Sequence, residues 1–295
     1  MAALTEHRVR IPLRVPVRGV EARVVTLLEG PAGWGECSPL PGDGPPAVAA
    51  ARRAAEEAAS VPWPAPVRDT VVCNALVPGV GPAEAARAAA AAVADGYRCV
   101  KVKVGDSGDV DRVAAVREAV GPAVAIRVDA NGAWRLDEAE AALARLGRHG
   151  LELAEQPVAT LEEMAALRRR VGVPLAADES VRTVDDACRL AALEAADAVV
   201  LKVQPLGGVR AAMEVAEAAG VAAIVTSMLE TSVGLAAGLA LAAALPELPY
   251  ACGLGTAGLL AGDVVADPLV PERGVLAVRR PVPDPGLLAA WEDGP

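Results

Sequence analysis

Short runs of β-branched residues alternate with alanine-rich segments along most of the chain. The segments 83–95, 136–146 and 209–219 have high helix propensity, and each is followed directly by glycine. From Val71 onward the β-branched runs end every 23 to 28 residues, at about Ala75, Lys103, Asp129, Glu155, Asp178, Lys202, Ser227 and Gly253. Eight strands with helices in most of the gaps predict a (β/α) barrel. An open doubly wound sheet is the alternative, but no glycine-rich phosphate fingerprint follows the first strand.

The two ends of the chain show a different pattern. Residues 9–17 and 21–28 are strand-like, and a turn at 30–33 follows them. Residues 46–60 predict a helix, and an extended proline-rich linker comes after it. We expect residues 34–41 to form a turn-rich loop that closes over a site on the barrel, and residues 264–295 to pack back on the N-terminal segment.

Composition excludes several classes of function. The net charge of −10 without a basic run argues against nucleic acid as a partner. We expect no membrane partner and a cytoplasmic location, because no apolar run could span a bilayer and the N-terminal residues lack the apolar core of a signal peptide. The five cysteines are too widely spaced for a zinc site or a disulfide framework, so we expect reduced cysteines in the core. A monomer or small homo-oligomer is expected.

Lysine is rare in a chain that has 28 basic residues, since only Lys101, Lys103 and Lys202 are lysines. An ammonium group can lose its proton when it is buried or crowded by charge, whereas a guanidinium group does not. Lys101 and Lys103 would lie on the same face of a strand, because side chains alternate along it. These three residues are therefore candidates for proton transfer or imine formation. The alternative is an ordinary edge strand with its charges outward.

Three acidic residues follow three consecutive predicted strands: Asp129, Glu155 and Asp178. The chemistry of a barrel sits at the carboxyl ends of its strands, so we expect these side chains to converge. Without a positive charge between them they would repel one another and their pKa values would rise. Each acid alone could be an ordinary loop residue, but the matched set predicts a site for a divalent cation. Mg²⁺ suits such oxygen ligands and leaves positions for substrate, and Mn²⁺ is the alternative metal.

The order and spacing of these motifs resemble the enolase superfamily, in its subgroup with a Lys-x-Lys motif on the second barrel strand. The matching segments are 100–105, 128–134, 155–157, 178–180 and 202–208. Two further segments, 29–39 and 229–238, are similar to those of the o-succinylbenzoate synthases. The resemblance implies an α/β fold, a modified (β/α)7β TIM-like barrel with an α+β capping domain formed by both termini. Residues 1–70 and 263–295 would then contribute to the capping domain and residues 71–262 to the barrel.

The resemblance also implies an activity and the residues that carry it. The implied reaction is the dehydration of a small carboxylate, 2-succinyl-6-hydroxy-2,4-cyclohexadiene-1-carboxylate, to o-succinylbenzoate in menaquinone synthesis, through an enediolate. Asp129, Glu155 and Asp178 would be the Mg²⁺ ligands, and the lysines would be catalytic. Lys103 would be the base, with Lys101 beside it and Lys202 opposite. The residues expected around the substrate are Asn131, Ser227 and Gly253.

Several alternatives follow from the same residues. Branches of the superfamily with a histidine base need a histidine at a strand end, and this chain has only His7 and His149. Dipeptide epimerases usually carry paired aspartates on strand 8, whereas no acid occurs here between 252 and 262. An N-succinylamino-acid racemase, using Lys103 and Lys202 as bases, or a muconate cycloisomerase stays open. A Schiff-base aldolase with an imine at Lys202 is a further alternative, although it would need no cluster of acids. A binding barrel without activity is least favoured.

Overall fold

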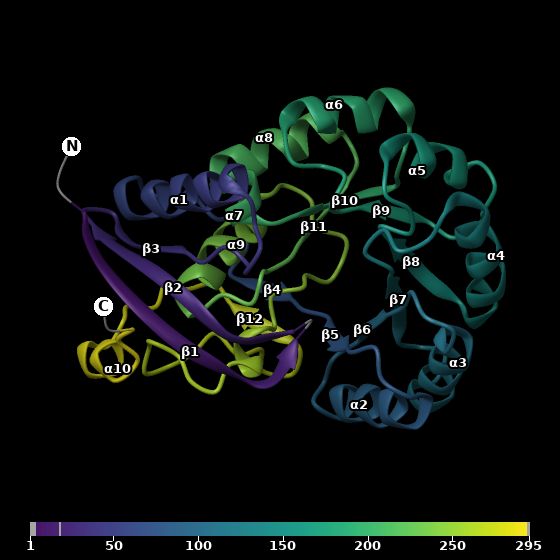
Figure 1. Cartoon of the computed structure of the whole chain (residues 1–295), viewed down its shortest axis with the longest axis horizontal. Helices are drawn as coiled ribbons and strands as arrows, with labels where there is room; N and C mark the ends of the chain where they lie inside the picture. Colours follow the sequence, from purple (N-terminus) through teal and green to yellow (C-terminus); the bar gives the residue numbers. More distant parts are fainter. Residues whose placement is uncertain (1–3, 18, 294–295) are drawn as a thin grey trace.

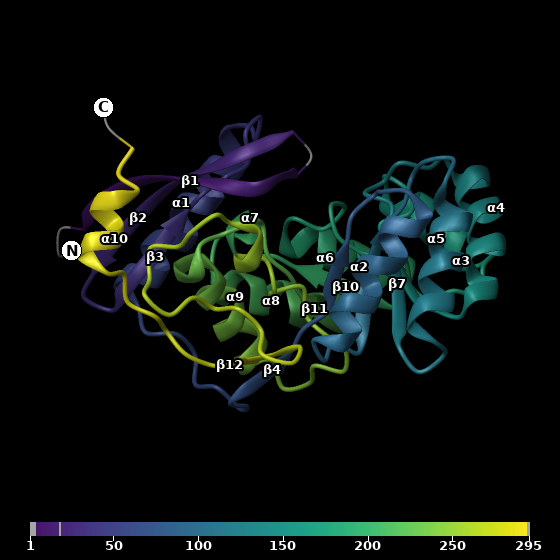
Figure 2. The same ribbon diagram turned by 90° about the horizontal axis from the view of Figure 1, so that it is seen from below.

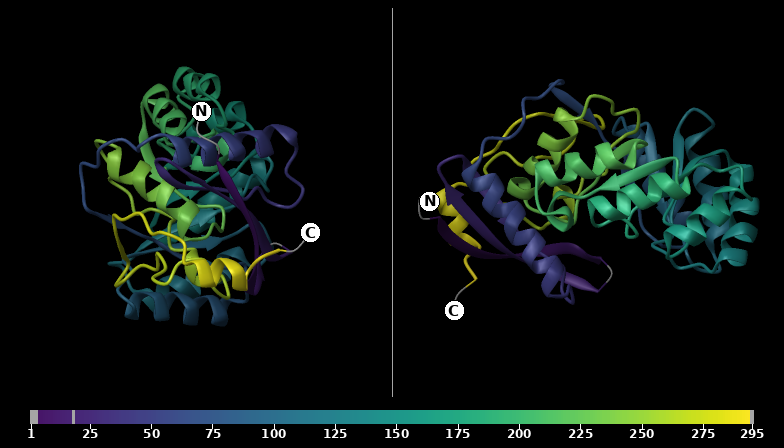
Figure 3. Two further views of the ribbon diagram at one scale, coloured as in Figure 1. Left: turned by 90° about the vertical axis from the view of Figure 1, so that its left-hand side faces the viewer. Right: turned by 90° about the horizontal axis from the view of Figure 1, so that it is seen from above.

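Three antiparallel strands and one helix form an N-terminal layer. The computed structural model describes residues 4–17 and 19–293. Strand β1 (Thr5–Val17) pairs with β2 (Val20–Gly30), and β2 pairs with β3 (Gly33–Cys37). Helix α1 (Pro45–Ser60) lies along this sheet and packs against β3 through a face of alanines (Figure 3). The predicted strands and helix of this region are confirmed.

The expectation of a loop over residues 34–41 is wrong for its first half. Residues 34–37 belong to β3 and pair with β2. Gly35 allows this strand to lie very close to α1, because a Cβ atom at Gly35 would come within 2.0 Å of the Ala55 carbonyl oxygen. A strand this short between glycines has too little alternation to be recognised from its sequence.

Seven parallel strands form the wall of the barrel, and they are adjacent in the order of the chain (Figure 1). They are β5 (Ala75–Val77), β6 (Cys99–Lys103), β7 (Ala125–Asp129), β8 (Leu151–Glu155), β9 (Leu175–Ala177), β10 (Ala198–Leu201) and β11 (Ala222–Val225). Parallel bridges from Gly253 to Thr226 and from Cys252 to Cys73 join the two ends of this sheet. The eighth position of the barrel is therefore two bridged residues, and the predicted modified barrel is confirmed.

Helices cover the outside of the barrel between its strands. They are α2 (Pro82–Ala94), α3 (Asp109–Val120), α4 (Leu136–Leu146), α5 (Leu161–Arg168), α6 (Val184–Leu193), α7 (Val203–Leu206), α8 (Val209–Ala219) and α9 (Ser232–Ala244), with short 3₁₀ turns η1 (Gly147–His149) and η2 (Ala257–Leu259). The predicted bounds of α4 and α8 are confirmed, and α2 begins one residue earlier than expected. No helix in the described part of the chain is both long and apolar enough to cross a membrane.

The C-terminal residues contact both the barrel and the N-terminal layer. Strand β12 (Val275–Ala277) pairs with β4 (Thr70–Val72), just before the barrel begins. Helix α10 (Pro285–Ala290) lies beside β1, and the Arg10 amide donates a hydrogen bond to the Trp291 carbonyl oxygen (Figure 2). The β4–β12 pair explains why the first predicted strand is displaced: the β-branched run there serves this pair, and β5 starts only at Ala75.

All five cysteines are free thiols, as expected. Cys73, Cys99 and Cys252 are buried, whereas Cys188 is exposed on α6, so the expectation that all of them lie in the core is wrong for Cys188. An alanine-rich amphipathic helix can place a small thiol on either face, and composition alone does not distinguish the two.

Candidate active site

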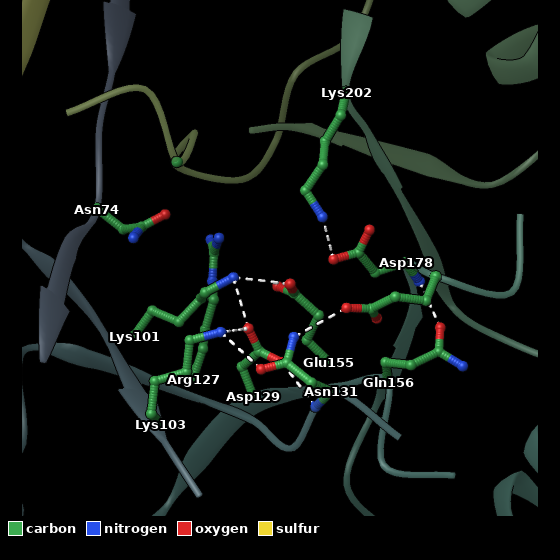
Figure 4. Close-up of polar contacts among 12 residues, drawn as sticks. Asn74, Lys101, Lys103, Arg127, Asp129, Asn131, Glu155, Gln156, Asp178 and Lys202 are labelled. Carbon is green, nitrogen blue, oxygen red and sulfur yellow. Dashed lines mark hydrogen bonds and ion pairs between the residues drawn. The ribbon is translucent and has the colours of Figure 1, made fainter. Parts of the chain in front are cut away.

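Three carboxylates meet at the carboxyl ends of neighbouring strands (Figure 4). Asp129 ends β7 and stands opposite Glu155, which ends β8, while Asp178 follows β9 directly. The three side chains are only 1–2% exposed. Parallel strands in register carry their last residues to one edge, so the fold brings together the acids that the sequence pattern singled out.

The three lysines of the chain approach these carboxylates from two sides (Figure 4). On β6, the Lys101 ammonium lies 2.7 Å from Glu155 Oε1 and 3.0 Å from Asp129 Oδ2. Lys103, two residues along the same face, contacts Asp129 and donates a hydrogen bond of 2.9 Å to Asn131 Oδ1. Lys202, which follows β10, contacts the Asp178 carboxylate from the other side. The lysines therefore flank the cluster.

Burial and charge divide the carboxylates into two kinds. Burial, with the charge of Asp129 beside it, raises the pKa of Glu155 to about 8. Burial acts the same way on Asp129, but the Lys101 and Lys103 ammonium groups outweigh it and hold the Asp129 pKa well below its usual range. Lys202 likewise outweighs burial and lowers the Asp178 pKa. Negative charge is thus least well compensated at Glu155.

The donor chemistry of the cluster fits a divalent cation. Its ligands would be hard carboxylate oxygens, and Asp178 Oδ1 is buried without a hydrogen-bond partner among the described residues. In residues 4–17 and 19–293, however, no three acidic, histidine or cysteine side chains are arranged to enclose a metal. Lysine contacts account for this arrangement, because Lys101 bridges two of the carboxylates and Lys202 contacts the third.

Two residues next to the acids have left-handed backbones and anchor the strand ends. Asn131 has a φ of 48°, and its side-chain Nδ2 donates to Glu179 Oε1 at 2.9 Å. Gln156 has a φ of 38° and is fully buried. Its Oε1 accepts a hydrogen bond of 2.7 Å from the Asp178 amide, so it ties the end of β8 to the end of β9. Gln156 lies in the matching segment 155–157, but its role in joining the two strand ends was not predicted from the sequence.

Ser227 and Gly253 lie together, apart from the hydrogen bonds of the carboxylate cluster. The Ser227 amide and hydroxyl both donate to the Gly253 carbonyl oxygen, at 3.1 and 2.8 Å. The Ser227 hydroxyl also lies 2.9 Å from Thr256 Oγ1. These contacts belong to the closure of the barrel between β11 and the eighth position, and the two residues' expected place around the substrate stays a prediction.

Two buried charged residues close to the cluster were given no role from the sequence. Arg127 lies on β7 two residues before Asp129 and donates to Glu152 and to the Ala251 carbonyl oxygen. Glu230 is buried in the segment after β11, where burial raises its pKa. Arg127 interrupts an apolar strand, and Glu230 lies in segment 229–238, which the sequence had already singled out.

Comparisons with known proteins cover nearly the whole chain. The family described as Enolase C-terminal domain-like matches residues 84–293, and the family described as Enolase N-terminal domain-like matches residues 8–59. The o-succinylbenzoate synthase of Thermobifida fusca is 55% identical, over 94% of this chain and 88% of the relative. The o-succinylbenzoate synthase of Mycolicibacterium smegmatis is 49% identical, over 96% of this chain and 88% of the relative.

Solved structures share the fold at lower sequence identity. The L-Ala-D/L-Glu epimerase from Bacillus subtilis superposes with a TM-score of 0.84 at 26% identity, covering 95% of this chain and 96% of the epimerase. The muconate lactonizing enzyme from Pseudomonas putida gives a TM-score of 0.86 at 24% identity, with 99% of both chains covered. The N-succinyl Arg/Lys racemase from Bacillus cereus gives 0.87 at 23% identity, covering 99% of this chain and 98% of the racemase.

Proposed function

The chain belongs to the enolase superfamily, and from its similarity to o-succinylbenzoate synthases within that superfamily we propose that it acts as one of them. Such a hydro-lyase removes water from 2-succinyl-6-hydroxy-2,4-cyclohexadiene-1-carboxylate and forms o-succinylbenzoate, a step of menaquinone synthesis. The observation that carries the proposal is a cluster of three buried carboxylates flanked on two sides by the only lysines of the chain.

Asp129, Glu155 and Asp178 are the proposed ligands of a divalent metal, which we take to be Mg²⁺, with Mn²⁺ as the alternative. Such an ion supplies positive charge for the substrate carboxylate as an enediolate develops. A metal held by these carboxylates would take the place of the Lys103 ammonium at Asp129 and of the Lys202 ammonium at Asp178. Lys202 would then be free to act on the substrate, and Lys103 would keep its contact with Asn131. Enzymes of the enolase superfamily use a lysine or histidine base together with Mg²⁺.

The proposed chemistry begins at Lys103. As a neutral amine it takes the proton from the ring carbon next to the substrate carboxylate, and Asn131 orients its side chain. The electron pair left behind moves into the enediolate and then forms a ring double bond as the hydroxyl group leaves. The Lys103 ammonium returns its proton to that hydroxyl, which departs as water. Aromatisation of the ring helps to drive the reaction forward.

The other two lysines keep their charge in this proposal. Burial opposes the charged form of Lys101, but attraction to Glu155 and Asp129 outweighs it and raises the Lys101 pKa above its usual range. Lys202 stands on the opposite side of the carboxylates and stabilises the negative enediolate as a cation. An aldolase would instead use the Lys202 amine to form an imine with its substrate.

Racemisation of N-succinylamino acids is a second candidate function. The placement of Lys103 and Lys202 on two sides of the carboxylates favours it, because a racemase needs a base on each face of its substrate.

We further propose that residues 71–262 carry the chemistry and that residues 1–70 and 263–295 set substrate choice. A cytoplasmic location and a monomer or small homo-oligomer stay predictions.

The test is direct. Purified protein is incubated with the cyclohexadiene carboxylate and Mg²⁺ while the absorbance of the aromatic product is followed. A parallel reaction contains one enantiomer of an N-succinylamino acid and is followed by polarimetry. We expect rapid formation of o-succinylbenzoate. Racemisation without aromatic product would replace the proposal with the second candidate.

A further inference from the structure

A reciprocal pair of hydrogen bonds ties the N-terminal layer to the segment that carries Lys202. The Ser38 amide donates to Gln204 Oε1 at 2.7 Å, and Gln204 Nε2 donates to Ser38 Oγ at 2.9 Å. Both residues are buried. Gln204 lies in the one-turn helix α7, and Lys202 is the residue that caps the amino end of this helix.

The same hydrogen-bond chain continues to the segment after β11. The Ser38 hydroxyl donates to Glu36 Oε1 at 2.6 Å, while the Thr231 hydroxyl and the Gly234 amide donate to Glu36 Oε2. A serine hydroxyl has one proton, so accepting from Gln204 and donating to Glu36 gives the chain a single direction. Gly234 makes room for it, because a Cβ atom there would lie 2.8 Å from Glu36 Cδ.

Helix α7 is a single turn that needs contacts with neighbouring elements to hold its position. It comprises only four residues, and a single helical turn is not stable by itself. It packs against α1 of the N-terminal layer, and Gln204 supplies its buried polar contact to Ser38. On the other side of this contact, the buried Arg23 guanidinium holds the Ser38 and Pro39 carbonyl oxygens. A buried polar chain with every member satisfied defines one geometry.

We propose that Ser38 and Gln204 are positioning residues, which, backed by Glu36, hold α7 and so place the Lys202 ammonium beside the carboxylate cluster. The inference rests on the proposed function only where it gives Lys202 a part in the chemistry. Precise placement matters, because an error of about 1 Å can cost roughly 100-fold in rate. Ser38 and Glu36 thereby act on the chemical step indirectly, through α7, while the rest of the N-terminal layer sets substrate choice and none of these three residues touches the reacting atoms.

Two variants and one matched control test the proposal. Gln204→Met keeps the length of the side chain without its polar atoms, and Ser38→Ala removes a single oxygen. Arg210→Gln is the control, since Arg210 joins α8 to Glu57 of α1 at 3.1 Å on the exposed side of the same junction. Thermal melts show that each variant folds. Hydrogen–deuterium exchange of peptides covering residues 36–42 and 198–207 then reports on the contact without any substrate.

We expect faster exchange in both peptides for Gln204→Met and Ser38→Ala, and wild-type exchange for Arg210→Gln. With the cyclohexadiene carboxylate, kcat should fall at least about tenfold in both variants while KM changes less, and the double variant should be no slower than the slower single one. A lower melting temperature with unchanged exchange and unchanged kcat would overturn the positioning role. If the wild-type protein lacks turnover, the proposed function fails, while the exchange data still decide whether Ser38 and Gln204 hold α7.

Discussion

Replacing Lys101 with methionine should make the stability of the fold depend on a divalent metal. The Lys101 ammonium lies 2.7 Å from Glu155 and 3.0 Å from Asp129, and both carboxylates are almost completely buried. Methionine has a similar length but leaves these carboxylates without their shared partner. Removal of one partner from a buried ion pair typically costs about 3–5 kcal/mol, because the remaining charge stays buried.

This loss is large enough to measure by thermal unfolding. In domains of about 150–250 residues, a loss of 1 kcal/mol in the free energy of unfolding lowers Tm by about 2–4 °C. Applied to this chain, the conversion gives a Tm on the order of 10 °C below wild type for the variant in the presence of a chelator. With saturating Mg²⁺ the missing positive charge is supplied at the carboxylates, and we expect the difference in Tm to shrink by about half or more. Lys101→Arg keeps the charge and is the control, with a smaller loss in the chelator.

The prediction is tested by comparing the loss of Tm of Lys101→Met in the chelator with its loss of Tm in Mg²⁺. An equal loss of Tm with chelator and with Mg²⁺ would show that the metal does not bind beside Lys101. A variant as stable as wild type in the chelator would show that the Glu155 and Asp129 carboxylates do not depend on the ammonium group.

Other variants address the chemistry and the N-terminal layer. Lys103→Arg should lower turnover by about 10²–10⁴-fold, because a guanidinium cannot accept the proton; near-normal turnover would refute its role as the base. By NMR, deuterium exchange from solvent into substrate or a saturated analogue should vanish in Lys103→Arg and survive in part in Lys202→Arg, whereas a racemase would show each variant exchanging one enantiomer only. Borohydride should not trap substrate on Lys202, and trapping would favour the aldolase. Substitutions at Pro39 or Leu40, in the loop after β3, should change KM more than kcat, and a loss of kcat alone would contradict this. Burial, with the nearby Glu230 charge, raises the pKa of Glu36 from 4.5 to about 7, so Glu36 ionises at a lower pH in the unfolded chain than in the folded one. The free energy of unfolding of the wild type should therefore fall by about 3 kcal/mol relative to Glu36→Gln as the pH rises from 4.5 to above 7. Urea unfolding at several pH values measures this difference, and a difference that does not change with pH would contradict the reasoning.

The barrel and its row of polar strand ends could be predicted from the sequence because each strand–helix unit is local. A run of β-branched residues and the following alanine-rich helix lie within about 26 residues of each other, so their repetition is visible as a regular spacing. Lys103, Asp129 and Glu155 stand at the last positions of three such strands, and the register of β6, β7 and β8 places them side by side. The regular spacing of the strands and their parallel register were therefore sufficient to predict that these three side chains are neighbours.

Contacts between distant segments left no such signal. The Ser38 amide and Gln204 are 166 residues apart, and β4 pairs with a strand near the C-terminus. The contact between Ser38 and Gln204 joins a loop to a single helical turn. Neither of these two segments has a hydrophobic period that could be recognised in the sequence. The ion pairs within the cluster also could not be predicted from the sequence, because the pattern places three lysines near three acids without indicating which lysine contacts which acid.

The most direct test of the account is the rate of o-succinylbenzoate formation before and after removal of divalent metal. The protein is dialysed against a chelator, assayed with the cyclohexadiene carboxylate, and assayed again after addition of Mg²⁺. We predict that turnover is lost after dialysis and returns with Mg²⁺, because Asp129, Glu155 and Asp178 are the proposed ligands. Full turnover by the metal-free protein would contradict the central claim.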